Sequence, residues 1–181
     1  MKFVLPILFL FLSIATLPNT ALASEEKCTV KNATQYNENH PLCFFLTGTR
    51  HFRNEEYLEA GEKWKEILKM SPFPDEFIDL LLKANNNLGY LYNQGLGYER
   101  DSKLALEYWE KAILLGSQET EYHLCYALAD EDNIIFFPER AILHCEKAYR
   151  IYNGIENKEK SDLEILDMVN ETISKLNSIE P

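Results

Sequence analysis

Residues 84–116 decide the fold, and they read ANNNLGYLYNQGLGYERDSKLALEYWEKAILLG. The first half of this stretch predicts a helix because its apolar residues recur at three- and four-residue spacing. These residues are Ala84, Leu88, Leu91 and Tyr92. Gly95 and Gly97 predict the end of this helix, because glycine readily adopts the left-handed conformation of a helix exit.

A second helix is expected over residues 103–115, with Asp101 as its N-cap. Its apolar face comprises Ala105, Tyr108, Trp109, Ala112 and Leu115. Small residues on both helices, such as Gly89, would let the two helices approach closely. Such a hairpin cannot bury its apolar faces alone, so the stretch predicts neighbouring units of the same kind.

The same stretch resembles the Sel-like repeat, a relative of the tetratricopeptide (TPR) repeat. The matching positions are Ala84, Leu88, Gly89, Tyr92, Gly95, Gly97, Asp101, Lys103, Ala105, Tyr108, Lys111, Ala112 and Gly116. The resemblance implies an all-α fold, a short α-solenoid of about three TPR/Sel-like helix hairpins. In such arrays the first helix of each hairpin lines the concave side.

The chain divides into three such units, residues 41–74, 75–117 and 118–154, followed by a segment at residues 155–181. The third unit follows from a shift of 36 residues, which brings Leu88 onto Leu124 and Ala105 onto Ala141. Its turn, residues 130–138, lacks glycine, and we expect Phe136 and Phe137 to pack beneath it. Residues 161–179 carry an apolar stripe and predict a C-terminal capping helix, with a partner-binding helix as the alternative. The stripe comprises Leu163, Leu166, Val169, Ile173 and Leu176.

Residues 1–23 predict a secretory signal peptide, with a basic start, an apolar run over residues 3–17 and a small-residue cleavage site at residues 21–23. The run is shorter than the roughly 20 residues that a membrane span needs. Residues 24–40 are polar and without periodicity, which predicts an irregular segment. The chain after residue 23 has 17 Lys and Arg residues against 29 Asp and Glu residues, a net charge of −12. This charge argues against nucleic acid and anionic lipid and favours a basic or neutral protein partner.

Four cysteines, Cys28, Cys43, Cys125 and Cys145, follow the signal peptide, and an even number in an exported chain predicts disulfides. Cys125 and Cys145 lie at similar distances from the turn of the third unit and align with Gly89 and Trp109. We therefore expect a Cys125–Cys145 bond and, by elimination, a Cys28–Cys43 bond. The alternative is a metal site formed by Cys125, Cys145, His123 and His144. Adjacent positions on a helix point about 100° apart, which disfavours convergence of all four on one ion.

The sequence contains no recognisable nucleophile, zinc-protease, phosphate-loop or cofactor motif, so we expect neither enzymatic activity nor a cofactor. A recognition surface is expected instead on the first helices, where aromatic and amide side chains lie off the core face. The predicted partner-binding residues are Phe45, Arg53, Asn86, Tyr90, Asn93, Tyr122, Tyr126 and Asp130. The alternative is that the tyrosines only pack between repeats.

The combined pattern predicts an exported, periplasmic or secreted protein-interaction module. The family resemblance implies an adaptor or regulatory role at the bacterial envelope, or an immunity protein that neutralises a secreted toxin. An alternative is β-lactam binding or hydrolysis, which the resemblance to cysteine-rich Sel-like proteins implies. The chain lacks the regular short cysteine spacing of those proteins.

Overall fold

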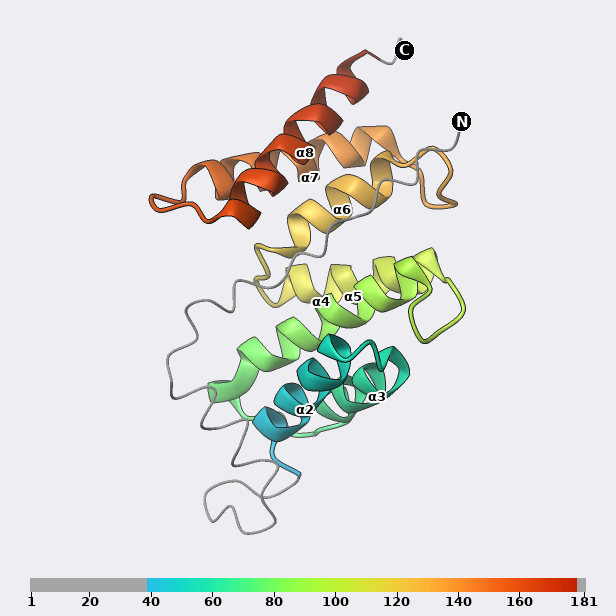
Figure 1. Cartoon of the computed structure of the whole chain (residues 1–181), viewed down its shortest axis with the longest axis vertical. Coiled ribbons are helices and arrows are strands. Elements are labelled where there is room, and N and C mark those ends of the chain that lie inside the picture. The colour runs from blue at the N-terminus through green and yellow to red at the C-terminus, as the bar shows by residue number, and fades with distance from the viewer. Residues whose placement is uncertain (1–38, 179–181) are drawn as a thin grey trace.

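The computed structural model describes residues 39–178, and within them the chain forms seven α-helices (Figure 1). Consecutive helices pack as antiparallel hairpins, and the last helix packs against the third hairpin. The helices are α2 (Pro41–Arg53), α3 (Tyr57–Leu68), α4 (Ile78–Gln94), α5 (Ser102–Leu114), α6 (Thr120–Ala129), α7 (Pro138–Asn153) and α8 (Lys160–Asn177). A 3₁₀ turn, η2 (Asp75–Phe77), precedes α4. The predicted all-α fold of consecutive hairpins is confirmed, and it is consistent with a short repeat solenoid.

Local sequence explains where these helices begin and end. Asp101 caps α5, because its carboxylate accepts a hydrogen bond of 2.9 Å from the backbone N–H of Leu104. Gly95 ends α4 in the left-handed conformation, with a φ of 69°. Helix α8 begins one residue earlier than expected, because Glu159 and Asp162 form a capping box around its first turn.

The first two hairpins close around the same contact, a glycine against a tryptophan. A Cβ built at Gly48 would lie 2.6 Å from Nε1 of Trp64, and one built at Gly89 would lie 2.5 Å from Nε1 of Trp109. Both tryptophans are fully buried. Each hairpin therefore needs glycine on its first helix so that the indole of its second helix can lie against the backbone.

The loop between α4 and α5 attaches the second hairpin to the first. Gly97, with a φ of 72°, lies against the backbone of Tyr57 and Leu58 at the start of α3. The hydroxyl of Tyr98 donates a 2.9 Å hydrogen bond to Glu62, and Nζ of Lys65 lies 4.2 Å from the centre of the Tyr98 ring. This loop therefore acts as an inter-repeat clasp as well as a connection within one hairpin.

Two expectations about the third hairpin and its cap are wrong. Phe136 and Phe137 do not pack beneath the α6–α7 turn but are 37% and 46% exposed. Leu163 is exposed at the edge of α8, whereas Ile165 is fully buried. The rest of the predicted stripe is confirmed, because Leu166, Val169 and Leu176 are buried and Ile173 packs against the same core.

Candidate functional site

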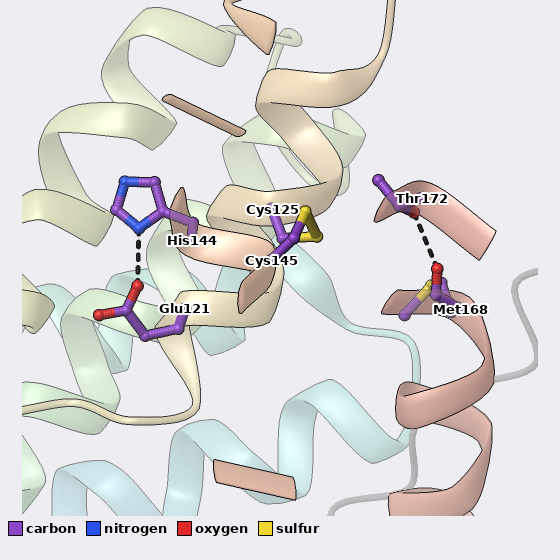
Figure 2. Close-up of a disulfide and its surroundings, with 6 residues drawn as sticks. All are labelled: Glu121, Cys125, His144, Cys145, Met168 and Thr172. Carbon is purple, nitrogen blue, oxygen red and sulfur yellow. Dashed lines mark hydrogen bonds and ion pairs between the residues drawn. A yellow bond between two sulfur atoms is a disulfide. The ribbon is translucent and has the colours of Figure 1, made fainter. Parts of the chain in front are cut away.

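A disulfide occupies the position in the third hairpin where the first two hairpins have a glycine and a tryptophan. Cys125 on α6 and Cys145 on α7 are bonded, with their Cα atoms 4.6 Å apart (Figure 2). Ala141 and Cys145 repeat the four-residue spacing of Ala105 and Trp109, and all four are buried. The predicted Cys125–Cys145 pairing is confirmed, whereas the Cys28–Cys43 pairing involves Cys28, which lies outside the described residues and stays a prediction.

An aromatic cluster around His123 joins the second hairpin to the third. The imidazole of His123 stacks on Trp109 with ring centres 5.6 Å apart and an angle of 6° between the rings. Its centre also lies 4.0 Å from that of Tyr122 and 5.9 Å from that of Tyr90. Burial in this cluster lowers the pKa of His123 to about 3, so the ring is neutral at neutral pH.

We predict that mild acid destabilises the fold, because His123 binds a proton in the unfolded chain and not in the native one. The pKa of His123 is lowered in the native state, so below its ordinary value of 6.5 the unfolded chain binds a proton that the native chain does not. Stability should therefore fall from pH 6.5 towards pH 3, by about 2 kcal/mol at pH 5, at about 1.4 kcal/mol per pH unit. Urea unfolding of the protein and of His123→Phe at pH 7.5 and pH 5 measures this loss. The same acid-induced loss in both proteins would contradict the prediction.

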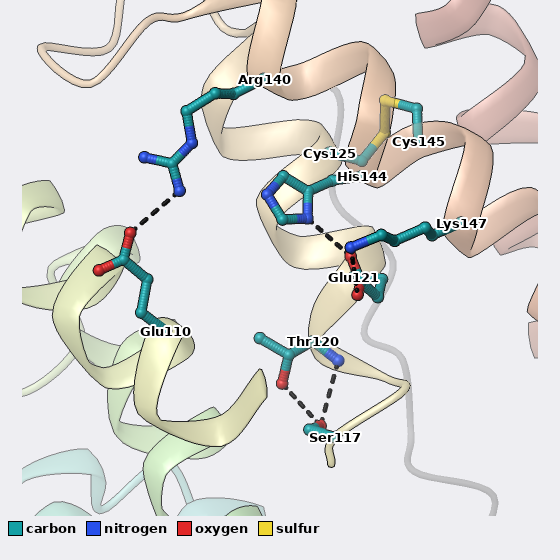
Figure 3. Close-up of polar contacts among 9 residues, drawn as sticks. All are labelled: Glu110, Ser117, Thr120, Glu121, Cys125, Arg140, His144, Cys145 and Lys147. Carbon is teal, nitrogen blue, oxygen red and sulfur yellow. Dashed lines mark hydrogen bonds and ion pairs between the residues drawn. A yellow bond between two sulfur atoms is a disulfide. The ribbon is translucent and has the colours of Figure 1, made fainter. Parts of the chain in front are cut away.

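His144 does not join His123 but pairs with a carboxylate on the neighbouring helix. Its Nδ1 lies 2.6 Å from Glu121, which also lies 3.4 Å from Nζ of Lys147 (Figure 3). Glu121 is almost completely buried, and this network joins α6 to α7 beside the disulfide. A carboxylate that fixes an imidazole is one part of an acid–base site. Among residues 39–178, however, no serine, threonine or cysteine is hydrogen-bonded to His144.

The metal-site alternative brought together two histidines and two cysteines. In the structure the two cysteines are bonded to each other. His123 stacks on Trp109, whereas His144 pairs with Glu121. Across the part of the chain that the structure describes, no three His, Cys, Asp or Glu residues are placed to hold a metal ion.

Asn86 and Asn93 lie in buried hydrogen-bond networks between repeats and not on an open face. The carbonyl of Asn86 accepts a 3.2 Å hydrogen bond from Nε1 of Trp109, and its side-chain oxygen accepts one of 2.8 Å from the hydroxyl of Thr120. Ser117 in turn hydrogen-bonds Thr120, as Figure 3 shows. Asn93 accepts hydrogen bonds from Ser102 and Asn133. The prediction that both asparagines lie off the core face is therefore wrong.

Phe45 and Tyr122 were also expected off the core face, and both are buried instead. Phe45 packs in the core formed by the first hairpin and α4. Tyr122 lies between His123 and Tyr152, with its ring centre 5.9 Å from that of Tyr152. Tyr122 is covered because α6 packs against α4, α5, α7 and α8, which leaves it little free surface.

The other four predicted residues retain access to solvent. Arg53 is exposed, and Tyr126 on α6 is 41% exposed. Tyr90 is half-buried, with its ring 6.2 Å from Phe52 and 5.9 Å from His123, and burial raises its pKa. Asp130 is partly exposed and lies 3.9 Å from Arg100. Arg53, Tyr90 and Tyr126 lie on the first helices of the three hairpins, and Asp130 directly follows the last of these helices. We call these four residues the first-helix set.

One exposed apolar group, formed by Ile134, Phe136 and Phe137 in the α6–α7 loop, was not predicted from the sequence. A usable signal was present in the sequence, since the acidic run of residues 130–132 immediately precedes these residues. A turn rich in carboxylates is poorly suited to cover apolar side chains, because the carboxylates must remain hydrated.

Other features of the chain bear on where it acts. No helix within residues 39–178 is long and apolar enough to cross a membrane. The Cys125–Cys145 bond is consistent with an oxidising compartment. The predicted signal peptide at residues 1–23 lies outside the described residues.

Comparison with protein families identifies one segment of the chain. Residues 82–117 match the Sel1 repeat, and they include most of α4 and all of α5. Searches of curated proteins and of solved structures gave no significant match. Sel1 repeats generally mediate protein binding, so the match implies a protein-interaction module. The clasped second hairpin, with its Gly89–Trp109 contact, is therefore a Sel1 repeat within an all-helical chain.

Proposed function

We propose that this protein is an exported interaction module that binds another protein through the first-helix set and performs no catalysis of its own. The Sel1 repeat at residues 82–117, flanked by hairpins of the same build, is the observation that carries the proposal. The signal-like residues 1–23 and the Cys125–Cys145 bond support action outside the cytoplasm. Such a module would act as an adaptor or as an immunity protein that neutralises a secreted toxin.

Tyr126 is the best anchor in this set. Tyr126 is 41% exposed, so a partner could bury its side chain without disturbing the core. Tyrosine is enriched among residues that contribute most to binding, because it combines a large apolar ring with a polar hydroxyl. Tyr90 is a weaker choice, since its contacts with Phe52 and His123 would mix recognition with packing.

The first test locates the partner. A photocrosslinking amino acid at position 126 of the exported full-length chain should give one dominant protein adduct in its native cells. The same amino acid at position 114 is the control, because Leu114 is 86% exposed on the second helix of its hairpin. The same adducts from both positions would count against binding through the first-helix set.

We predict that Tyr126→Ala weakens binding of the crosslinked partner by about 2 kcal/mol, which is roughly a 30-fold increase in Kd. The melting temperature should change little, because much of the side chain is already in water. Calorimetric titration and thermal unfolding of Tyr126→Ala and Leu114→Ala measure both quantities. An unchanged affinity, or a fall in melting temperature that accounts for the lost binding, would contradict the proposal.

A further inference from the structure

The loop between α6 and α7 exposes three apolar side chains within four residues. Ile134 is 74% exposed, Phe136 37% and Phe137 46%. The loop lies on the same side of the molecule as the α4–α5 loop (Figure 1), and the Arg100–Asp130 contact joins the two. We call residues 130–137 the acidic apolar loop. Single exposed apolar residues are common on protein surfaces, whereas a contiguous group often marks an interaction site.

The backbone of the acidic apolar loop is held in place by hydrogen bonds. Asn133 donates its backbone N–H to the carbonyl of Asp130, and its buried side chain donates to Asn93. The N–H of Phe136 donates to the carbonyl of Asn133, and that of Phe137 to the carbonyl of Leu128 on α6. The apolar side chains are thus presented by an ordered backbone. A preordered surface loses less conformational entropy when a partner binds.

Carboxylates flank these apolar side chains in the sequence. Asp130 and Glu131 pair with Arg100 and Lys175, at 3.9 Å and 2.9 Å. Asp132 within the loop and Glu139 just after it are exposed, and neither forms an ion pair with any residue of the described range 39–178. The loop therefore combines apolar anchors with uncompensated negative charge.

The negative charge of the loop indicates which kind of protein segment could bind it. Residues 24–38 of the same chain contain three glutamates and two lysines, so they offer no net positive charge to the loop. A second copy would bring the same carboxylates and a net charge of −11. We propose that the acidic apolar loop docks a basic segment of another protein, one that carries aromatic or large aliphatic side chains between its lysines or arginines. The apolar side chains of this segment would cover Ile134, Phe136 and Phe137. Its lysines or arginines would form ion pairs with Asp132 and Glu139.

The test uses the full chain and synthetic peptides as probes. The first peptide interleaves lysine with phenylalanine and leucine, the second replaces its lysines by glutamate, and the third replaces its apolar residues by serine. Backbone NMR shift mapping should place the first peptide on residues 130–139 and show no binding of the other two at the same concentrations. Phe137→Ser should weaken binding of the first peptide at least tenfold, and Asp132→Asn about threefold. Added salt should weaken that binding further.

Control variants outside the loop distinguish binding at this site from non-specific attraction of the peptide to the acidic protein surface. Leu143→Ser on α7 changes an exposed apolar residue outside the loop, and Asp167→Asn on α8 changes an exposed carboxylate. Both should leave the affinity unchanged. Equal weakening by these controls, or binding of the serine peptide as tight as that of the first, would overturn the proposal. Sedimentation showing a dimer that Phe137→Ser abolishes would overturn it in favour of a second copy. Tyr126→Ala should retain peptide binding, so a failure of this proposal is separate from a failure of the first-helix set.

Discussion

Replacing Trp109 by alanine is expected to lower the free energy of unfolding by about 3–5 kcal/mol, the usual cost of emptying a buried tryptophan site. Three observations place this residue among the most sensitive in the chain. Its side chain is fully buried, its Nε1 donates to the carbonyl of Asn86, and its ring stacks on His123. The substitution would thus weaken the second hairpin and its contact with the third together.

Urea unfolding followed by circular dichroism measures the effect. Leu114→Ala on the same helix is the matched control, because Leu114 is exposed and its loss should change stability by less than about 0.5 kcal/mol. A Trp109→Ala protein as stable as this control would show that α5 is not held by its indole. That result would contradict the packing described for the Sel1 repeat.

The second large effect is expected for Gly97→Ala in the clasp between the first two hairpins. A Cβ at this position would clash with the backbone nitrogen of Leu58 and lie 2.7 Å from the carbonyl carbon of Tyr57. Backbone atoms cannot rotate away as a flexible side chain can, so α3 or the loop must move. Overpacking costs about 1–3 kcal/mol and the left-handed conformation about 1–2 kcal/mol more. The expected destabilisation is therefore about 2–5 kcal/mol.

Gly116→Ala separates the two causes of this loss. Gly116 also has a positive φ, 97°, but a Cβ there would meet nothing within 4 Å. It should therefore cost only the conformational part, about 1–2 kcal/mol. Thermal or urea unfolding of the two variants gives the comparison. Equal losses would mean that the contact with Tyr57 and Leu58 contributes nothing and that the loop is not a clasp.

The hairpins could be predicted from the sequence because their signals are local. Helical spacing, the Asp101 cap and the Gly95 exit lie within a few residues of the elements that they define. The Cys125–Cys145 bond could also be predicted, because the 36-residue repeat aligns its two positions with Gly89 and Trp109. The repeat therefore made it possible to predict a contact between two residues that are far apart in the sequence.

The predicted recognition residues depended on how helices pack, and there the sequence was a poorer guide. Counting positions along one helix identifies a single buried face, but α6 is covered by several other helices. Tyr122 is consequently buried, and Asn86 serves the inter-repeat network through Thr120. For Phe136 and Phe137 the prediction erred in the opposite direction, because their apolar character suggested burial and both side chains are exposed.

The short span of the Cys125–Cys145 bond bears on what proteolysis can do to this protein. The bond encloses the 20-residue separation between its cysteines, and that interval contains the exposed loop at residues 130–137. Exposed loops are the preferred sites of proteolytic cleavage. A single cut in this loop would break the chain but leave α6 and α7 covalently joined. The nicked protein would remain one molecule, so a cut in the exposed loop would not release α7 and α8 from the rest of the chain.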